Sequence, residues 1–571
     1  MSQLTNLAEI DLLPIPGKTY FNTDREWREE FIYFLMVDRF HDNDNRNPTP
    51  GSARTFGVYI NGDTFYGGTI KGITNHLDYI AGLGCTAIWL SPVFENTDTG
   101  YHGYHIRNYL NIDPHFGTKQ DLVDLVQAAH SFIKDGKPYP IRIILDVVIN
   151  HSADTWYYKG RSQGGGPAYS GQPFEFGDWR SADYPIPLEL RNAQLYHKKG
   201  NIQQWDVSPE NLEGDLIDLK DYNNEDTADG SALLNILIKS HCYWIKEADI
   251  DGFRVDAVKH FYPLACARFS SAVREYAYSL GKRNFFLFGE LANSDDEIYQ
   301  RYLGPNTSDH DQGKTVFYGI NSLLDFRLAK GVDNDPLKGP LRSVITGRAD
   351  PASLFSRLAS QENQSLNRGE LGRYLVSFVD NHDIFWQSGR IASEGNDEQI
   401  IAAIGFILCA LGTPCIYYGT EQGFAGWGSD YGIREAMFDK GIPGKNLLNT
   451  DCFIYKAIGA IASIVKQYPS LRFGRMYYRE ISGDGIHFNL PYGYTYTLAF
   501  SRMLYGQEIL VAYNVSSFPR TDYVIVDRAY HQPGDILHFL YGASGNVVVQ
   551  TDGTANFVQL KLAPHQFVIL A

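Results

Sequence analysis

The sequence has little of what marks secreted, membrane-spanning or disulfide-stabilised proteins. Its 6 cysteines in 571 residues are scattered, several of them inside apolar runs, which is typical of buried free thiols rather than of a disulfide framework. No stretch reaches the roughly 18 apolar residues of a membrane span. The N-terminus lacks the basic and apolar regions of a secretory signal, so we expect a cytoplasmic protein.

Positive charge is also scarce. The chain carries 50 lysines and arginines against 66 aspartates and glutamates, a formal net charge of −16. This balance disfavours nucleic acids and anionic membranes as partners, because their phosphates would be repelled, whereas a neutral polysaccharide is indifferent to it. The length exceeds that of one average domain and the hydrophobic fraction of 44% is ordinary, so two or three globular domains are expected.

What the sequence does contain is four apolar runs that each end in a polar cluster with a carboxylate. They are IRIILDVVINH (141–151), DGFRVDAVKH (251–260), FFLFGE (285–290) and LVSFVDNHD (375–383). Short apolar runs of this kind are typical of buried parallel strands. A barrel or an open sheet gathers the carboxyl ends of such strands on one face, so groups far apart in the sequence meet there.

This arrangement would place three carboxylates around one small space, flanked by basic and imidazole side chains. Two or three carboxylates around one space are the apparatus for cleaving a glycosidic bond. The carboxylates are Asp256, Glu290 and Asp383, and the flanking residues are Arg254, His151 and His382.

In this order, the four segments closely resemble the four signature regions of the α-amylase family of glycoside hydrolases (family 13). The resemblance covers roughly residues 30 to 440. Because Lys259 and His260 follow the segment around Asp256, it is most like the α-amylases and the cyclodextrin-forming enzymes of the family. Supporting matches are FYGGTIKG (65–72), LGCTAIWLSP (83–92), YHGY (101–104), IDP (112–114) and GTPCIYYGTEQ (412–422).

The resemblance implies an α/β fold, a (β/α)8 TIM barrel with an inserted domain after the third strand and a C-terminal antiparallel β-sandwich. The composition and residue pattern of the chain agree with this fold. Residues 152–220 are rich in glycine and aromatics, and the chain after about 474 alternates predicted short strands with turns. We therefore expect an N-terminal extension at 1–30, the catalytic barrel at 31–151 and 221–473, the inserted domain B at 152–220 and the C-terminal domain at 474–571.

The predicted catalytic residues have distinct roles. Asp256 is the predicted nucleophile, because Arg254 lies on the same side of an extended segment and would keep its carboxylate ionised and oriented. Glu290 follows an apolar strand, and burial raises a carboxyl pKa, as a general acid requires. The resemblance implies that Asp383 holds substrate hydroxyls and stabilises the oxocarbenium-like transition state.

The resemblance also implies a set of substrate-binding residues. Tyr104 would stack on the ring of the cleaved sugar. The alternative interpretation is that Tyr104 is a buried core residue. His151 and His382 would donate hydrogen bonds to the same sugar. The full predicted set is Tyr104, His151, Arg254, Lys259, His260 and His382.

One structural Ca²⁺ between barrel and inserted domain is the expected cofactor. The resemblance implies Asn150, Asp221 and the carbonyl oxygen of His260 as its ligands, since calcium prefers oxygen. The alternative is that the ammonium of Lys220, inside the same segment, occupies the site instead. DNDNRN (42–47) resembles a second calcium loop, with Asp42, Asp44 and Asn47 as its ligands. The alternative interpretation of this segment is a solvated polar turn.

The predicted function is α-amylase activity, the retaining hydrolysis of internal α-1,4-glucosidic bonds in starch, glycogen-type glucans and maltooligosaccharides. The enzyme alternative is a 4-α-glucanotransferase or a maltooligosaccharide-forming or cyclodextrin-acting relative, in which sugar rather than water intercepts the glycosyl-enzyme. A barrel that only binds glucan would lose catalytic carboxylates, and all three are present. The expected partner is an α-glucan, and the oligomeric state is left open.

Overall fold

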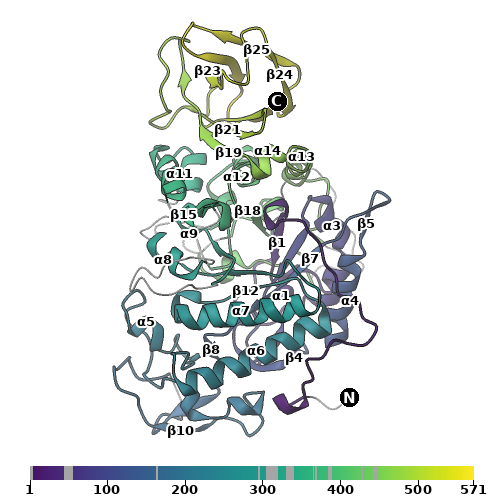
Figure 1. Ribbon diagram of the computed structural model, residues 1–571, viewed down its shortest axis with the longest axis vertical. Coiled ribbons are helices and arrows are strands. Elements are labelled where there is room, and N and C mark those ends of the chain that lie inside the picture. Colours follow the sequence, from purple (N-terminus) through teal and green to yellow (C-terminus); the bar gives the residue numbers. More distant parts are fainter. Residues whose placement is uncertain are drawn as a thin grey trace.

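A closed barrel of eight parallel strands forms the centre of the molecule (Figure 1). The computed structural model describes residues 4–43, 54, 56–162, 165–292, 296–303, 319–329, 340–363, 365–366, 369–383, 389–426, 428–440 and 446–571. Neighbours in the chain are neighbours in the barrel. The strands are β1 (Ile32–Leu35), β2 (Ala87–Leu90), β7 (Arg142–Val147), β12 (Gly252–Val255), β13 (Phe286–Gly289), β14 (Ser322–Leu324), β17 (Leu375–Ser377) and β18 (Thr413–Tyr417).

Every residue of these eight strands is buried. Parallel strands that are covered on both faces need apolar side chains on both faces, which is why they appear in the sequence as continuous apolar runs. The TIM barrel expected from the resemblance is therefore confirmed, and the carboxyl ends of the strands open toward one face.

Helices connect successive strands around the outside of the barrel. Several start at side-chain caps: Thr118 and Asp121 form a capping box at α4, and Asn396 and Gln399 form one at α12. The principal helices are α2 (Ile70–Thr74), α3 (Leu77–Gly82), α4 (Lys119–His130), α6 (Ala228–Ala248), α7 (Pro263–Ser279), α8 (Asp296–Tyr302), α10 (Pro340–Ile345), α11 (Ala352–Asn363), α12 (Asp397–Cys409), α13 (Phe453–Gln467) and α14 (Pro469–Phe473).

An insertion lies between β7 and α6, at the end of the molecule away from the C-terminal domain (Figure 1). Its short strands β8 (His151–Ser152) and β11 (Lys220–Asp221) pair antiparallel, so the chain leaving the barrel and the chain returning to it lie side by side. Between them lie β9 (Trp156–Tyr158), β10 (Phe176–Trp179) and α5 (Glu210–Glu213). We call the chain before β9 the outgoing limb and the chain before and within β11 the returning limb.

The described N-terminal residues pack on the barrel rather than forming a separate core. Trp27 stacks on Phe286 at the first residue of β13, with ring centroids 4.3 Å apart. Nζ of Lys282 donates to the carbonyl oxygen of Phe21 over 3.0 Å. This segment therefore contributes to the end of the barrel opposite the carboxyl ends of the strands.

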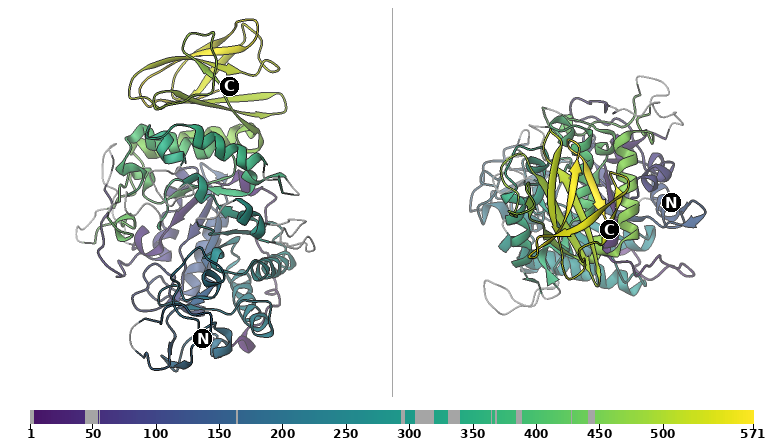
Figure 2. Two further views of the ribbon diagram at one scale, coloured as in Figure 1. Left: turned by 90° about the vertical axis from the view of Figure 1, so that its left-hand side faces the viewer. Right: turned by 90° about the horizontal axis from the view of Figure 1, so that it is seen from above.

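The C-terminal domain is an antiparallel sheet that packs over α12 and α13 (Figure 2). Nine strands form one continuous ladder in the order β19-β21-β22-β27-β24-β25-β26-β23-β20, and the ladder folds over its own small apolar core, which includes Leu510, Val524 and Val558. The nine strands are β19 (Arg475–Tyr478), β20 (Ile481–Ser482), β21 (Thr497–Leu504), β22 (Gln507–Asn514), β23 (Arg520–Val526), β24 (Ile536–Tyr541), β25 (Asn546–Thr551), β26 (Asn556–Leu562) and β27 (Phe567–Leu570).

Two further expectations concern the cysteines and the apolar runs. All six cysteines are buried and free, as predicted. Among the residues that the structure describes, no helix combines the length and the apolar character needed to cross a bilayer.

Candidate active site

Arg254 joins the two predicted catalytic carboxylates. It belongs to β12, Asp256 follows that strand directly, and Glu290 follows the neighbouring strand β13. Nη1 of Arg254 lies 2.7 Å from Oδ1 of Asp256, and Nη2 lies 2.8 Å from Oε2 of Glu290. Because the guanidinium is fully buried, both ion pairs are shielded from water and hold the carboxylates in fixed positions.

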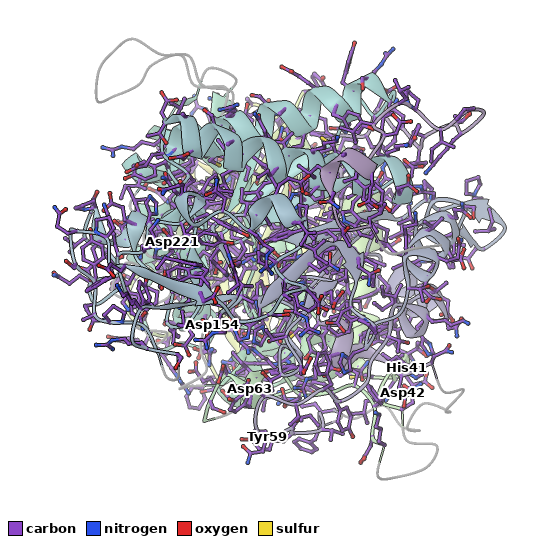
Figure 3. All side chains as sticks on the ribbon, turned by 90° about the horizontal axis from the view of Figure 1, so that it is seen from below. His41, Asp42, Tyr59, Asp63, Asp154 and Asp221 are labelled. Carbon is purple, nitrogen blue, oxygen red and sulfur yellow. The ribbon has the colours of Figure 1, made fainter. Side chains whose placement is uncertain are left out.

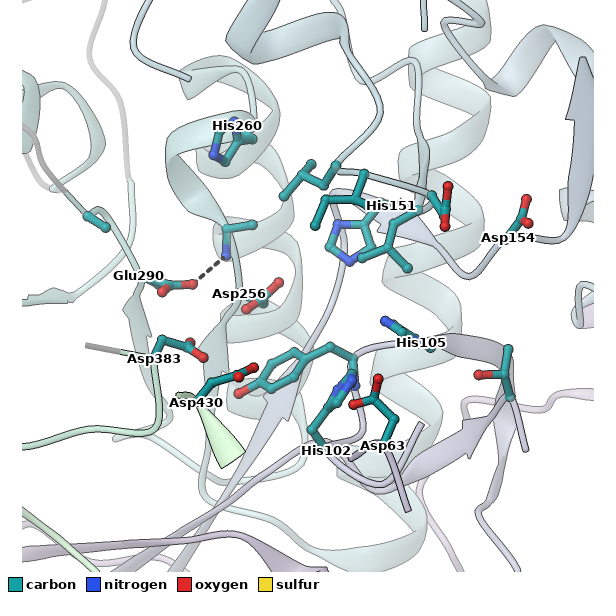
Figure 4. Close-up of a pocket in the computed structure, with 18 of the residues that line it drawn as sticks. Asp63, His102, His105, His151, Asp154, Asp256, His260, Glu290, Asp383 and Asp430 are labelled. Atoms are coloured by element: carbon teal, nitrogen blue, oxygen red, sulfur yellow. Dashed lines mark hydrogen bonds between the residues drawn. The ribbon is translucent and has the colours of Figure 1, made fainter. Parts of the chain in front are cut away.

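The backbone around these carboxylates has unusual features. Ala257, directly after Asp256, has a φ of 50°, in the left-handed region that side chains other than glycine rarely adopt. Its N–H donates to Oε2 of Glu290 over 3.2 Å (Figure 4). A Cβ at Gly289 would lie 2.7 Å from a methyl group of Val258, so a side chain there would displace the strand end that carries Glu290.

The third carboxylate, Asp383, is held by two side chains. Nε2 of His382 lies 3.0 Å from Oδ2 of Asp383, and Nη2 of Arg434 lies 2.7 Å from Oδ1. Nε of Arg434 also donates to the carbonyl oxygen of His382 over 3.0 Å. Arg434 lies outside the four signature segments and the sequence analysis missed it. The only signal was the i, i+4 spacing to Asp430, with which it pairs at 3.4 Å.

Asp146 is the hub of a buried polar network beneath the site. Its Oδ1 accepts from Nη1 of Arg254 over 2.9 Å, and its Oδ2 accepts from the hydroxyl of Tyr104 over 2.9 Å and from Nε1 of Trp89 over 3.1 Å. The hydroxyl of Tyr104 also lies 2.8 Å from Nε2 of His382. The ring of Tyr104 is partly exposed in the cleft, so its position is compatible with stacking on a sugar.

The other predicted substrate-binding residues lie on the side of the cleft nearest the insertion. Within the described residues, no side chain bonds to either ring nitrogen of His151, and burial lowers its pKa to about 3, so the ring is neutral. The ammonium of Lys259 binds the carboxylate of Asp206. Nδ1 of His260 lies 2.6 Å from the carbonyl oxygen of Asn211. Lys259 and His260 therefore contact the insertion at α5 and at the segment just before it.

The three carboxylates open into one cleft of about 920 Å³ (Figure 4). This volume suits a ligand of several rings. Loops supply much of the lining, and strand-end patterns in the sequence do not point to them. Trp205, which is 41% exposed beside the cleft, lies in the segment 152–220 that is rich in aromatics, but nothing in the sequence distinguished it from the other aromatics there. The lining residues that the sequence analysis missed include Asp63, His102, Trp205, Asp430, Tyr431 and Arg434.

Burial and neighbouring charges separate the pKa values of the three carboxyls. Burial raises the pKa of Asp256 to about 6 and that of Glu290 to about 7, against the opposing effect of Arg254. Burial alone would also raise the pKa of Asp383, but His382, Arg434 and Arg254 hold it below its ordinary value. Asp383 is thus the most acidic of the three and Glu290 the least. Asp256 is more acidic than Glu290, which is the order that the predicted nucleophile and proton donor require.

These shifts predict a bell-shaped dependence of kcat/KM on pH. If Asp256 is the nucleophile and Glu290 the proton donor, as predicted, the active form has Asp256 deprotonated and Glu290 protonated. Activity would then fall on the acid side as Asp256 gains a proton and on the alkaline side as Glu290 loses one. Because the two carboxyls interact, the two apparent pKa values of the pH profile describe the pair rather than either residue alone. The apparent pKa on the acid side should lie above the ordinary carboxyl pKa of about 4. Initial rates on soluble starch across the pH range measure this. An acid limb at or below that value would contradict the raised pKa of Asp256.

Asp221, one of the three residues expected to bind calcium beside the insertion, already has partners at both carboxylate oxygens. Its Oδ1 accepts from Nδ2 of Asn150 over 3.1 Å, and its Oδ2 lies 2.5 Å from Nδ1 of His197. Oδ1 of Asn150, by contrast, is a buried oxygen without a hydrogen-bond partner among the described residues. Calcium takes six to eight oxygen ligands. In the part of the chain that the structure describes, no three or more His, Cys, Asp or Glu side chains form a metal-binding group.

The second calcium loop falls largely outside the described residues, which include Asp42 but not Asp44 or Asn47. Oδ1 of Asp42 lies 4.0 Å from Nδ1 of His41. In Figure 3, Asp42 lies well apart from Asp154 and Asp221 of the insertion. The two predicted metal sites are therefore separate places on the molecule and are testable independently.

Comparison with known proteins agrees with this geometry. The chain is 28% identical over 558 residues to an α-amylase of Streptomyces lividans, covering 85% of this chain and 55% of that protein. It is 28% identical over 497 residues to a cyclomaltodextrin glucanotransferase of Klebsiella oxytoca, covering 80% and 67%. The chain thus spans only about half the length of the first of these relatives.

A solved structure shares the whole architecture. The crystal structure of an α-amylase from Geobacillus thermoleovorans in complex with acarbose superposes with a TM-score of 0.68 at 25% identity, covering 96% of this chain and 99% of that one. The family model for the α-amylase catalytic domain matches residues 34–450, which include all eight barrel strands except the first two residues of β1. The chain therefore belongs to the α-amylase family of glycoside hydrolases.

Proposed function

We propose that this protein is an α-amylase, a retaining hydrolase of internal α-1,4-glucosidic bonds in starch- and glycogen-type glucans and maltooligosaccharides. The observation that carries the proposal is the sharing of one buried guanidinium, that of Arg254, by Asp256 and Glu290 at the ends of neighbouring strands. Retention requires two carboxyl groups about 5–5.5 Å apart, and a common guanidinium keeps the pair close.

In the proposed mechanism, a carboxylate oxygen of Asp256 attacks the anomeric carbon of the sugar. Glu290 gives its proton to the glycosidic oxygen. The bond between the anomeric carbon and this oxygen breaks, and the leaving chain departs as an alcohol. In the second step Glu290 takes a proton from water, and the oxygen of that water attacks the anomeric carbon and releases Asp256. Two inversions give net retention.

The neighbouring residues support both steps. Asp383, kept ionised by Arg434, would bind sugar hydroxyls and stabilise positive charge as the glycosidic bond breaks. Tyr104, fixed through its hydroxyl by Asp146, would offer its ring face to the sugar. The neutral ring of His151 would exchange hydrogen bonds with a hydroxyl of the same sugar.

Glycosyl transfer is the second candidate, because cyclomaltodextrin glucanotransferases match this chain as well as α-amylases do. Both reactions share the glycosyl-enzyme and differ only in whether water or a sugar hydroxyl attacks it. A product profile on amylose, maltotriose and cyclodextrin separates them. Hydrolysis gives a rise in reducing ends that matches the bonds broken, whereas transfer gives longer or cyclic products without that rise.

The stereochemical test addresses the proposed pair directly. Proton NMR of freshly released sugar is expected to show the α-anomer first, followed by slow mutarotation to the equilibrium mixture. A retaining α-amylase of known stereochemistry, measured under the same conditions, serves as the control for mutarotation. Immediate appearance of the β-anomer would contradict the assignment of Asp256 as nucleophile.

A further inference from the structure

Lys220 is a buried cation in the segment where a calcium ligand was expected. Its side chain is only 2% exposed. Its Nζ lies 3.4 Å from Oδ2 of Asp215 and 3.3 Å from Oδ1 of Asp154. The ammonium also lies 5.2 Å from the ring centroids of both Trp156 and Tyr158, within cation–π reach. Two carboxylates and two aromatic faces therefore surround it.

These partners come from both limbs of the insertion. Asp154 belongs to the outgoing limb, and Tyr158 to β9, which follows that limb directly. Asp215 and Lys220 belong to the returning limb. The hydroxyl of Tyr158 also donates to Oδ2 of Asp215 over 2.7 Å, and the N–H of Asp221 donates to Oδ1 of Asp215 over 3.0 Å. The ammonium thus bridges the two chain segments, beside the pairing of β8 with β11 and the hydrogen bond from Tyr158 to Asp215.

A divalent cation would compete with these contacts. Both oxygens of Asp215 and both oxygens of Asp221 already accept from protein donors, which a metal would have to displace. A metal bound to Oδ2 of Asp215 would also lie close to the buried ammonium of Lys220, which is 3.4 Å from that oxygen, and charge repulsion is poorly screened there. We propose that Lys220 takes the place of a structural calcium in this chain, as the cation that ties the outgoing limb to the returning limb.

The first test is metal analysis combined with thermal unfolding of the full-length protein. The chain should carry Asp42→Ala, Asp44→Ala and Asn47→Ala, so that the N-terminal loop lacks all three of its predicted calcium ligands. We expect no calcium above background in the purified protein and the same Tm with and without EGTA. A stoichiometric calcium whose removal by EGTA lowers the Tm would overturn the proposal, because a metal would then be the stabilising cation.

The second test replaces the lysine itself. Lys220→Met keeps the length of the side chain but leaves Asp215 buried without its cation, so the Tm should fall by on the order of 3 °C or more. Lys159→Met is the matched control, since Lys159 forms an exposed ion pair with Glu175 in the same insertion and its loss should leave the Tm unchanged.

An unchanged Tm in Lys220→Met would contradict the proposal, because the ammonium would then hold nothing together. Should that variant not fold, the metal analysis and the EGTA comparison on the chain that retains Lys220 still decide between lysine and calcium. Neither readout depends on catalytic activity, so failure of this proposal is distinguishable from failure of the proposed function.

Discussion

The Asp256→Asn variant is expected to keep its fold and to lose kcat on soluble starch by roughly ten-thousand-fold or more. An amide is not a nucleophile toward the anomeric carbon, yet its oxygen can still accept from Arg254. That guanidinium also keeps Asp146 at 2.9 Å and Glu290 at 2.8 Å, so the buried network stays charge-compensated. Reducing-sugar release and the Tm, measured on the same preparation, report turnover and folding separately.

The control for this experiment is Asp178→Asn, the same chemical change at an exposed position on β10, away from the cleft. It should have wild-type kcat and Tm, since surface substitutions have little effect. A folded Asp256→Asn protein with wild-type turnover would show that another group attacks the sugar, and the assignment of the nucleophile would be wrong.

Glu290→Gln is expected to divide the reaction into its two steps. On starch, whose leaving group needs a proton, kcat should fall by roughly a hundred- to ten-thousand-fold. A maltosyl fluoride of α configuration has a leaving group that departs without protonation, so the first step should survive on this substrate. Because Glu290 is also the proposed base for water, the glycosyl-enzyme should then accumulate, and mass spectrometry of peptides should find the sugar on Asp256.

The double variant Asp256→Asn with Glu290→Gln is the matched control, and it should carry no sugar after the same incubation. A label on any peptide other than the one with Asp256 would contradict the proposed roles. A first burst of fluoride release slowed as much as starch hydrolysis would contradict Glu290 as acid, because protonation would then not be what the glutamine fails to supply in the first step.

Much of the barrel was predictable because its signals are local. The apolar runs at 141–151, 251–260 and 285–290 contain β7, β12 and β13, since a strand buried on both faces must be apolar at consecutive positions. For the C-terminal domain, the alternation of short strands and turns predicted an antiparallel fold, but not that nine strands form one ladder, because the ladder order depends on pairings between distant segments.

The candidate site divides in the same way. Asp256, Glu290 and Asp383 each follow a strand, so the strand pattern alone predicted that they lie near one another. Arg434 and Asp146 were not assigned a role, because nothing local distinguishes an arginine in a loop or a carboxylate within a strand from an ordinary structural residue. Their functions follow only from their partners, Asp383 for the first and Arg254 for the second.

The sequence by itself determined the barrel, the family resemblance and the three strand-end carboxylates, because each depends on residues close together in the chain or on the order of such segments. Only the tertiary structure decided which charges share a guanidinium, which carboxyl stays most acidic and whether Lys220 faces solvent or the carboxylates of Asp154 and Asp215. These properties depend on burial and on distances between residues separated by many positions in the chain, and small differences in either change the energy of a charge by more than any local sequence pattern records.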